Sequence, residues 1–404
     1  MQSRALYRVV KRCFSGTLAV SLALGLVFVP LSTRAAGDPL EINAILSLSG
    51  AGSFVGKAEA SALGALETTV NTAGGLGGRP IKFAIVDDQS NAQVAVQLGS
   101  GLLAKGASVI LGPTLVAPCQ ALAPLVKGKA VEFCLSSGFH PERDSYGFTS
   151  GVSTLDQLVF AVQYLRQIGL RKIATLTSLD ANGQDADRGI EAALGRPENR
   201  DVSLVAAFHF NLAELTVAAQ MARIKSSGAQ ALINYNTGTP FGTVLHGYAD
   251  VGLDLPLVTQ PAALSYAVME QYASFLPKQL LITGLVGDAP AVAPRGPIQT
   301  ALATYAKAFK AAGLAPDHVT ALVWDPAMII ITAYRKLGPN ASGAQLNDFI
   351  QNLHGWAGIN GEYDFRTGQS GLVSRSLVMV QWSPAKKTFV AVSRPGGGPL
   401  TVSQ

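Results

Sequence analysis

Small hydroxyl residues recur in the loops that follow predicted strands of this chain. Ser47 ends the first strand and Ser49 follows it, Thr114 follows the third, and Ser136 and Ser137 follow the fourth. Hydroxyl groups and the free main-chain N–H groups at helix starts can hold a small anion, aided by the helix dipole. Serine and threonine also cap helices where no ligand binds, so this pattern alone leaves both roles open. Three further loops, expected at the same edge of a second sheet, comprise residues 179–184, 236–241 and 259–263.

Patterns that would support catalysis are weak. The five histidines lack metal-ligand spacing, and the sequence contains neither an H-E-x-x-H motif nor a G-x-S-x-G elbow. Asp87 is expected to end a strand and Asp88 to cap or to face solvent, with a carboxylate pair as the alternative. His140 is expected on a loop surface, with a position near the ligand loops as the alternative. The glycine-rich segment 74–78 follows a helix and precedes a strand, the reverse of a phosphate-binding loop. We therefore expect no catalytic residues, no cofactor and no metal site, and not an enzyme.

The elements that position the first loops alternate between strand and helix. Right-handed crossovers between parallel strands would place the helices on both faces of one doubly wound sheet. The predicted strands are 41–47, 81–87, 109–112 and 130–135, and the predicted helices are 56–73, 91–105 and 118–126.

A second set of segments also alternates between helix and strand and predicts a second doubly wound parallel sheet. The predicted fold class is therefore α/β. After residue 281 the pattern changes to long helices and then to hairpin strands within 363–392. The second series comprises helices 154–168, 184–194, 214–226 and 240–251, and strands 172–177, 202–208, 231–235 and 256–259. The later helices are 297–312, 319–336 and 342–354.

The first 36 residues are typical of a secretory signal peptide. Four basic residues precede the apolar segment 18–29, and small residues follow it, with cleavage expected near Ala35 or Ala36. That segment is shorter than the about 20 residues that span a bilayer, which disfavours an uncleaved anchor. We therefore expect export to the periplasm.

The composition excludes several classes of protein. With 404 residues, 48% hydrophobic and 14% charged, the chain is not disordered. Its formal charge is +5, but five of its 31 basic residues lie in the first 36 residues. The 26 that remain equal the 26 acidic residues, so we expect no nucleic-acid partner.

Two cysteines remain once the signal peptide, which contains Cys13, is removed. Cys13 precedes the apolar segment, so lipidation after that segment is not indicated. In an oxidising compartment the pair Cys119 and Cys134 predicts a disulfide, with two buried free thiols as the alternative.

Short segments in a fixed order resemble the type I periplasmic solute-binding proteins of the leucine/isoleucine/valine-binding family. The resemblance is strongest over residues 41–140 and continues to about Val390. The segments are 46–56 (LSLSGAGSFVG), 71–81 (NTAGGLGGRPI), 87–90 (DDQS), 110–114 (ILGPT), 135–138 (LSSG), 324–327 (WDPA) and 361–365 (GEYDF).

The resemblance implies two lobes joined by three crossovers and a ligand cleft that closes by a hinge. Lobe 1 would comprise residues 37–156 and 285–370, and lobe 2 residues 157–284 and 371–404. It also implies the substrate-binding component of an ABC importer, which delivers a small-molecule ligand to a membrane permease, and we expect a monomer. A protein that feeds a sensory or chemotaxis receptor is the alternative.

Family ligand positions transfer to this chain with some departures. The family hydroxyl of the third loop falls on Val116, the usual threonine of the fourth loop falls on Gly138, and Val55 stands where amino-acid binders commonly have an aromatic residue. The acidic residue that binds the α-ammonium group should fall near Gln260. The predicted ligand-binding residues are Ser49, Phe54, Val55, Thr114, Leu115, Val116, Ser136, Ser137, Asn182, Thr239 and Gln260.

The loops also indicate the class of ligand. An ammonium group buried without a counter-charge costs several kcal/mol, and the six loops contain few acids, Asp180 and, at the edge, Asp185. The residue types therefore favour a small carboxylate with an apolar or aromatic body over a free branched-chain amino acid, which stays the alternative.

Overall fold

The computed structural model describes residues 38–149, 151–236, 238–372 and 374–400, and these form one compact unit. The predicted signal peptide, with Cys13 and the expected cleavage site, lies outside the described residues.

The first sheet has five parallel strands in the order β2-β1-β3-β4-β5. Its central strands are buried, as a parallel sheet covered on both faces requires. The order reverses between β1 and β3, so the loops after these two strands diverge at a switch point, where open α/β sheets bind ligands. The strands are β1 (Leu40–Leu46), β2 (Ile81–Asp87), β3 (Val109–Leu111), β4 (Val131–Cys134) and β5 (Gly147–Thr149).

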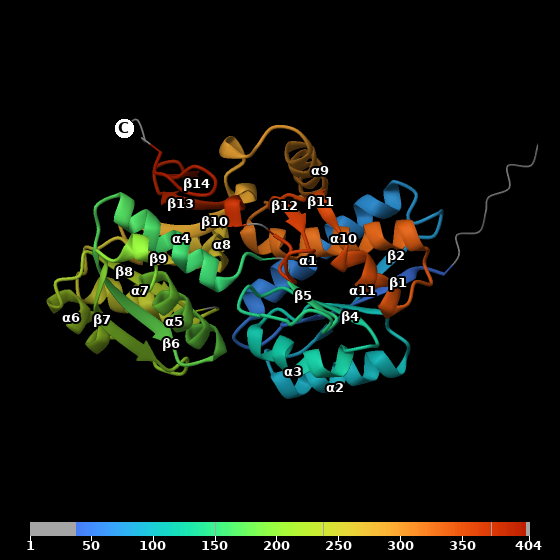
Figure 1. Cartoon of the computed structure of the whole chain (residues 1–404), viewed down its shortest axis with the longest axis horizontal. Coiled ribbons are helices and arrows are strands. Elements are labelled where there is room, and N and C mark those ends of the chain that lie inside the picture. Colours follow the sequence, from blue (N-terminus) through green and yellow to red (C-terminus); the bar gives the residue numbers. More distant parts are fainter. Residues whose placement is uncertain (1–37, 150, 237, 373, 401–404) are drawn as a thin grey trace, which may run out of the picture. The chain divides into compact units, whose positions relative to one another are not determined.

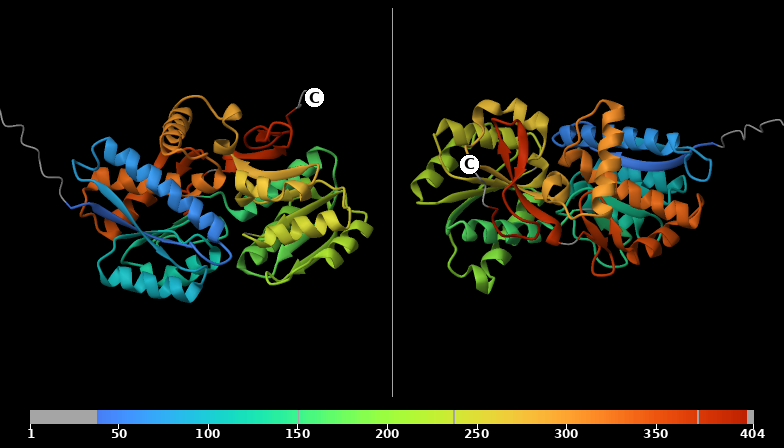
Figure 2. Two further views of the ribbon diagram at one scale, coloured as in Figure 1. Left: turned by 180° about the vertical axis from the view of Figure 1, so that it is seen from behind. Right: turned by 90° about the horizontal axis from the view of Figure 1, so that it is seen from above.

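Helices cover both faces of this sheet (Figure 1). Helices α2 (Ala92–Ala104) and α3 (Val116–Val126) lie on one face, where Asn91 caps α2 by accepting from the N–H groups of Gln93 and Val94. The other face carries α1 (Ser53–Thr72), α10 (His318–Leu337) and α11 (Gly343–Gln351), whose apolar sides join one large core. Figure 2 shows β1 and β2 between the two layers.

The second sheet has seven strands in the order β14-β13-β10-β9-β8-β6-β7. The five from β6 to β10 are parallel, while β13 and β14 are antiparallel additions beside β10 (Figure 2). A second switch point falls between β6 and β8. The strands are β6 (Lys172–Ser178), β7 (Ser203–Phe210), β8 (Ala231–Tyr235), β9 (Leu257–Thr259), β10 (Leu280–Leu285), β13 (Leu377–Ser383) and β14 (Thr388–Ala391).

Helices cover both faces of this sheet as well. Alternate residues of its strands point to opposite faces, and the two sets join two different hydrophobic cores. One face packs on α4 (Thr154–Gln167) and α5 (Ala181–Leu194). The other packs on α6 (Ala218–Ser226), α7 (Pro240–Asp250) and α8 (Tyr266–Gln271).

The chain passes between the sheets three times, which confirms the predicted fold class. It leaves the first sheet after β5, returns after β10 through α9 (Pro297–Ala312) to α10 and α11, and crosses again to β13. The lobe boundaries given above remain a prediction.

The C-terminal region differs from the expected pattern in two ways. Helix α11 ends at Gln351, because the chain turns into β11 (His354–Ala357), which pairs with β12 (Glu362–Asp364). Of the hairpin strands predicted within 363–392, β13 and β14 form a regular hairpin, while Tyr363 pairs with Leu372 only through an isolated antiparallel bridge. Strands β5 and β10 and helix α8 were not predicted.

Candidate functional site

Asp87, the last residue of β2, holds the loop that follows β1. Its Oδ1 accepts from the N–H groups of Leu48 (2.9 Å) and Ser49 (3.2 Å), and the Ser49 hydroxyl donates to Oδ2 (2.6 Å). Burial raises the pKa of Asp87, but these hydrogen bonds outweigh it and hold the pKa below its usual value. Ser49 therefore orders the loop through Asp87, and its contact with a ligand remains a prediction.

Asp88 is fully buried beneath the same loop, so the expectation that it could face solvent is wrong. Its Oδ1 accepts from the Ser47 hydroxyl (2.7 Å) and from the Ser90 N–H (2.8 Å), a local turn cap. Burial raises the pKa of Asp88 despite these bonds. Nothing in the sequence DDQS indicates which of the two acids turns inward.

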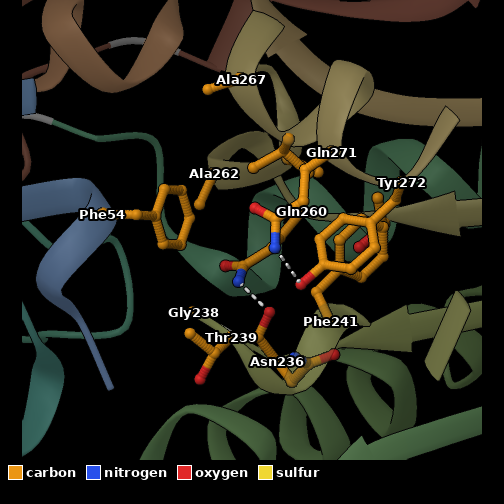
Figure 3. Close-up of a pocket in the computed structure, with 13 residues that line it drawn as sticks. Phe54, Asn236, Gly238, Thr239, Phe241, Gln260, Ala262, Ala267, Gln271 and Tyr272 are labelled. Atoms are coloured by element: carbon orange, nitrogen blue, oxygen red, sulfur yellow. Dashed lines mark hydrogen bonds between the residues drawn. The ribbon is translucent and has the colours of Figure 1, made fainter. Parts of the chain in front are cut away.

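A first cavity, cavity 1, lies where the start of α1 meets the ends of β8 and β9 (Figure 3). The Phe54 ring enters from α1, and the Phe241 and Tyr272 rings lie on the far side of Gln260. The Gln260 side-chain amide donates to the main-chain carbonyl oxygen of Asn236. The residues that line cavity 1 are Phe54, Asn236, Gly238, Thr239, Phe241, Thr259, Gln260, Ala262, Ala263, Ala267, Val268, Gln271 and Tyr272.

Two polar side chains of cavity 1 have no hydrogen-bond partner among the described residues. They are the Asn236 amide, 2% exposed, and the Thr259 hydroxyl, fully buried. Because a buried unpaired polar group costs about 1–3 kcal/mol, both can gain by binding a polar group of a ligand.

A second cavity, cavity 2, adjoins the first and shares Gln260 and Ala262 with it. Its lining includes hydroxyl residues from the loops after β3 and β4, together with residues of the second sheet and of the segments that cross between the sheets. Its lining residues are Val55, Thr114, Leu135, Ser136, Ser137, Gly151, Val152, Gln157, Gln260, Pro261, Ala262, Leu285, His318, Leu322, Asn360 and Leu377.

Three helices start beside these cavities. Phe54 and Val55 lie in the first turn of α1, Thr114 lies two residues before α3, and His318 is the first residue of α10. Neither α1 nor α3 has a side-chain cap. The Ser53 and Val55 N–H groups of α1 donate to the carbonyl oxygens of Gly50 and Gly52, so it is mainly the dipoles of the two helices that favour a negative group at this edge.

Charged side chains are scarce in the linings of both cavities. Among the described residues, neither lining includes Asp, Glu, Lys or Arg. His318 lines cavity 2, and its Nδ1 lies 2.9 Å from Asp288 Oδ2 in a buried pair. A bound carboxylate would therefore be held mainly by hydroxyl and N–H dipoles, and an ammonium group would find no carboxylate in the lining.

The structure brings seven of the eleven predicted ligand residues to the cavities. Phe54, Thr239 and Gln260 line cavity 1, and Val55, Thr114, Ser136, Ser137 and again Gln260 line cavity 2.

The other four lie close by, outside both linings. Ser49 binds Asp87, and Leu115 packs beside Gly52. Val116 and Asn182 both lie near Gly138, where an added Cβ would come within 2.8 Å of Val116 Cγ2. The two family departures, Val116 and Gly138, are thus sterically complementary. Ligand contact by these four residues remains a prediction.

Loops from the two sheets touch beside the cavities. His140, after β4, places Nε2 2.7 Å from Oδ1 of Asp185 on α5, and Arg188 lies 2.9 Å from the same oxygen. Burial raises the pKa of Asp185, but the hydrogen bond and charge of His140 lower it overall. On the other side, Gly238 has φ +91° and approaches Ala51 so closely that a Cβ would lie 2.4 Å from its carbonyl oxygen.

The predicted disulfide is present. Cys119 in α3 is bonded to Cys134 at the end of β4, with Cα atoms 5.9 Å apart. It lies directly behind the loops that carry Thr114 and Ser136.

Two further searches cover the described residues alone. Within them, no cluster of three or more His, Cys, Asp or Glu side chains is placed to hold a metal ion. None of the helices in the described part is both long and apolar enough to cross a membrane.

Comparison with known proteins settles the family. A family profile described as periplasmic binding protein matches residues 39–388. The chain belongs to this family. The members of this family are solute-binding proteins, not enzymes. Membership of the family implies a location in the periplasm or outside the cell. A comparison with curated protein sequences gives no match.

This binding protein is also similar to solved structures, at identities that show the fold alone. A branched-chain amino acid transporter substrate-binding protein from Streptococcus pneumoniae, in complex with isoleucine, has 16% identity and a TM-score of 0.74, covering 88% of this chain and 99% of that one. A solute-binding protein from Rhodopseudomonas palustris in complex with 4-hydroxybenzoate has 17% identity and a TM-score of 0.72, covering 90% and 96%. Another from that organism, in complex with benzoate, has 16% identity and a TM-score of 0.75, covering 90% and 98%.

Sequence reasoning about this binding protein missed several lining residues. Gln271 is the last residue of the six-residue helix α8, and Tyr272 follows it. This helix is too short to give a periodic hydrophobic pattern in the sequence. Asn236 lies within a loop that was singled out, although the residue itself was not. His318 and Asn360 come from segments far along the chain, and no local pattern links them to the cavities.

Proposed function

We propose that this protein is the substrate-binding component of an ABC importer of the branched-chain amino acid type. It captures a small carboxylate with an apolar or aromatic body and delivers it to a membrane permease. The ligand lies in cavities 1 and 2, between two lobes with the predicted boundaries. The protein acts as an exported, non-catalytic periplasmic monomer.

The lining of the cavities is the observation that carries this proposal. Cavity 2 offers the hydroxyls of Thr114, Ser136 and Ser137 near the starts of α1 and α3, which have no side-chain cap, and this suits a carboxylate. Cavity 1 offers the rings of Phe54 and Tyr272, which suit a flat apolar body. Since the two share Gln260 and Ala262, one ligand can occupy both.

A free amino acid fits this lining less well. Its ammonium group needs a carboxylate, and the two acids of the neighbouring loops are engaged elsewhere. Asp180 caps α5 through the Gly183 N–H (3.1 Å), and Asp185 binds His140 and Arg188. The solved structures with isoleucine, benzoate and 4-hydroxybenzoate indicate that the fold accommodates both ligand classes, so the choice rests on the residues of this chain.

Isothermal titration calorimetry on residues 37–404 tests the proposal with benzoate, 4-hydroxybenzoate, leucine and isoleucine. We expect an aromatic acid to bind near micromolar Kd, about −8 kcal/mol, with weak or no binding of the amino acids. Tyr272→Ala should weaken that binding, while Phe349→Ala, an aromatic truncation outside both cavities, should not. Tight leucine binding with no response to aromatic acids would refute the proposed ligand class.

A further inference from the structure

A fully buried glutamate stands directly behind cavity 2. Glu59 lies on α1, and its Oε2 is 2.6 Å from Oγ1 of Thr114, which lines the cavity. The Ser47 N–H donates to the same Oγ1 at 3.1 Å. The second carboxyl oxygen, Oε1, is buried and has no hydrogen-bond partner among the described residues. The cavity lining does not include Glu59, so Glu59 can reach a ligand in this cavity only through Thr114.

The hydrogen-bond capacity of Thr114 limits what it can offer. A hydroxyl has one hydrogen and two lone pairs, and Ser47 already uses one lone pair. If Glu59 is ionised, the Thr114 hydrogen must donate to it, and the hydroxyl can present only an acceptor to the cavity. If Glu59 carries a proton, its O–H donates to Thr114 and frees the hydroxyl hydrogen to point at a ligand.

The surroundings favour the protonated form. Burial raises the pKa of Glu59 to about 8, outweighing the hydrogen bond of Thr114, and the nearby acid Asp88 raises it further. No basic side chain of the described residues pairs with Glu59. On α10, which packs against α1, His318 binds Asp288 and Asp325 binds the N–H groups of Ile359 and Asn360. On α1 itself, Lys57 is exposed and Glu67 binds the Phe83 N–H.

We propose that protonated Glu59 is a positioning residue that makes Thr114 a hydrogen-bond donor to the carboxylate of the ligand. This inference rests on the proposed function and adds a proton-linked element to it. Deprotonation of Glu59 turns the Thr114 hydroxyl from a donor into an acceptor and places a second negative charge behind the ligand carboxylate. Binding then weakens as the pH rises.

Calorimetry with benzoate between pH 6.5 and pH 9.5 tests this directly. For the wild type, we expect Kd to rise by up to about 30-fold, since at pH 9.5 a group with pKa about 8 is about 3% protonated. In Glu59→Gln the amide N–H donates to Thr114 at every pH, so the Kd of this variant should stay flat across the range. The matched control Glu67→Gln, on the same helix, should keep the wild-type profile. If the Kd of the wild type and the Kd of Glu59→Gln changed with pH in the same way, the inference would be overturned.

A ligand-free measurement separates this inference from the proposed function. Infrared difference spectra of the wild type minus Glu59→Gln at pH 6.5 should show the C=O band of a protonated carboxyl group. Absence of that band would overturn the inference even if benzoate binds. A folded protein that shows the band but binds no aromatic acid would instead refute the proposed ligand class while supporting the protonated Glu59–Thr114 pair.

Discussion

Replacing Glu59 by glutamine should change how the stability of the protein depends on pH. The pKa of Glu59 is raised from 4.5 to about 8 in the folded protein, chiefly by burial. Between these values the unfolded chain loses a proton that the folded protein keeps. The contribution of Glu59 is therefore fully present below pH 4.5 and is lost as the pH rises towards 8. The whole change corresponds to about 5 kcal/mol, at about 1.4 kcal/mol per pH unit.

Urea unfolding followed by tryptophan fluorescence at pH 5, 6.5 and 8 measures this effect. Glutamine does not titrate, so the stability of Glu59→Gln relative to the wild type should increase by about 3.5 kcal/mol between pH 5 and pH 8. Other titrating groups cancel in this comparison. Glu191→Gln, at an exposed position of α5, controls for the substitution itself. A difference between Glu59→Gln and wild type that stays within about 1 kcal/mol over this range would refute the reasoning.

Three further changes test other parts of the structure. Replacing both Cys119 and Cys134 by alanine should lower the free energy of unfolding in urea by about 3 kcal/mol, because the bond closes a loop of 15 residues; an unchanged midpoint would contradict this. Asp325→Ala removes the acceptor of two N–H groups and a tyrosine hydroxyl in segment 359–363, and should cost about 3 kcal/mol in the same assay, whereas a loss below about 1 kcal/mol would argue against the network. Gly238→Ala places a Cβ against the Ala51 carbonyl oxygen, so calorimetry should show benzoate bound at least about tenfold more weakly. The circular dichroism spectrum should be unchanged. An unaltered Kd would show that the close contact between Gly238 and Ala51 is not needed for binding.

Much of the fold could be predicted from local sequence, because strong boundary residues flank many elements. Strand β2 has the bounds that were predicted, between Pro80 and the turn at Asp88. Helix α9 also matches, since Pro297 starts it and Gly313, in the left-handed conformation, ends it. Strand β10 was missed because a short apolar run such as LLITGL does not by periodicity distinguish a strand from a buried helix segment, and its antiparallel partner β13 is distant in sequence.

The site was predictable to the extent that it follows the carboxyl ends of parallel strands. That rule groups Thr114, Ser136 and Ser137 from the order of strands and loops alone, and the structure brings all three to cavity 2. The same rule does not predict the buried side chains that lie behind these three residues. A glutamate in a helix is usually exposed, so the burial of Glu59 and its bond to Thr114, 55 residues away, depend on tertiary packing that leaves no local trace.

The covalent link between Cys119 and Cys134 has a consequence for how the protein must be produced. It ties together the segments that present Thr114 and Ser136, which limits their spread in the empty protein. Less chain entropy is then lost when the ligand is captured. Polypeptide made in a reducing cytosol should keep both sheets but bind its ligand more weakly than exported material, so a biosensor built on this scaffold needs an oxidising route of synthesis.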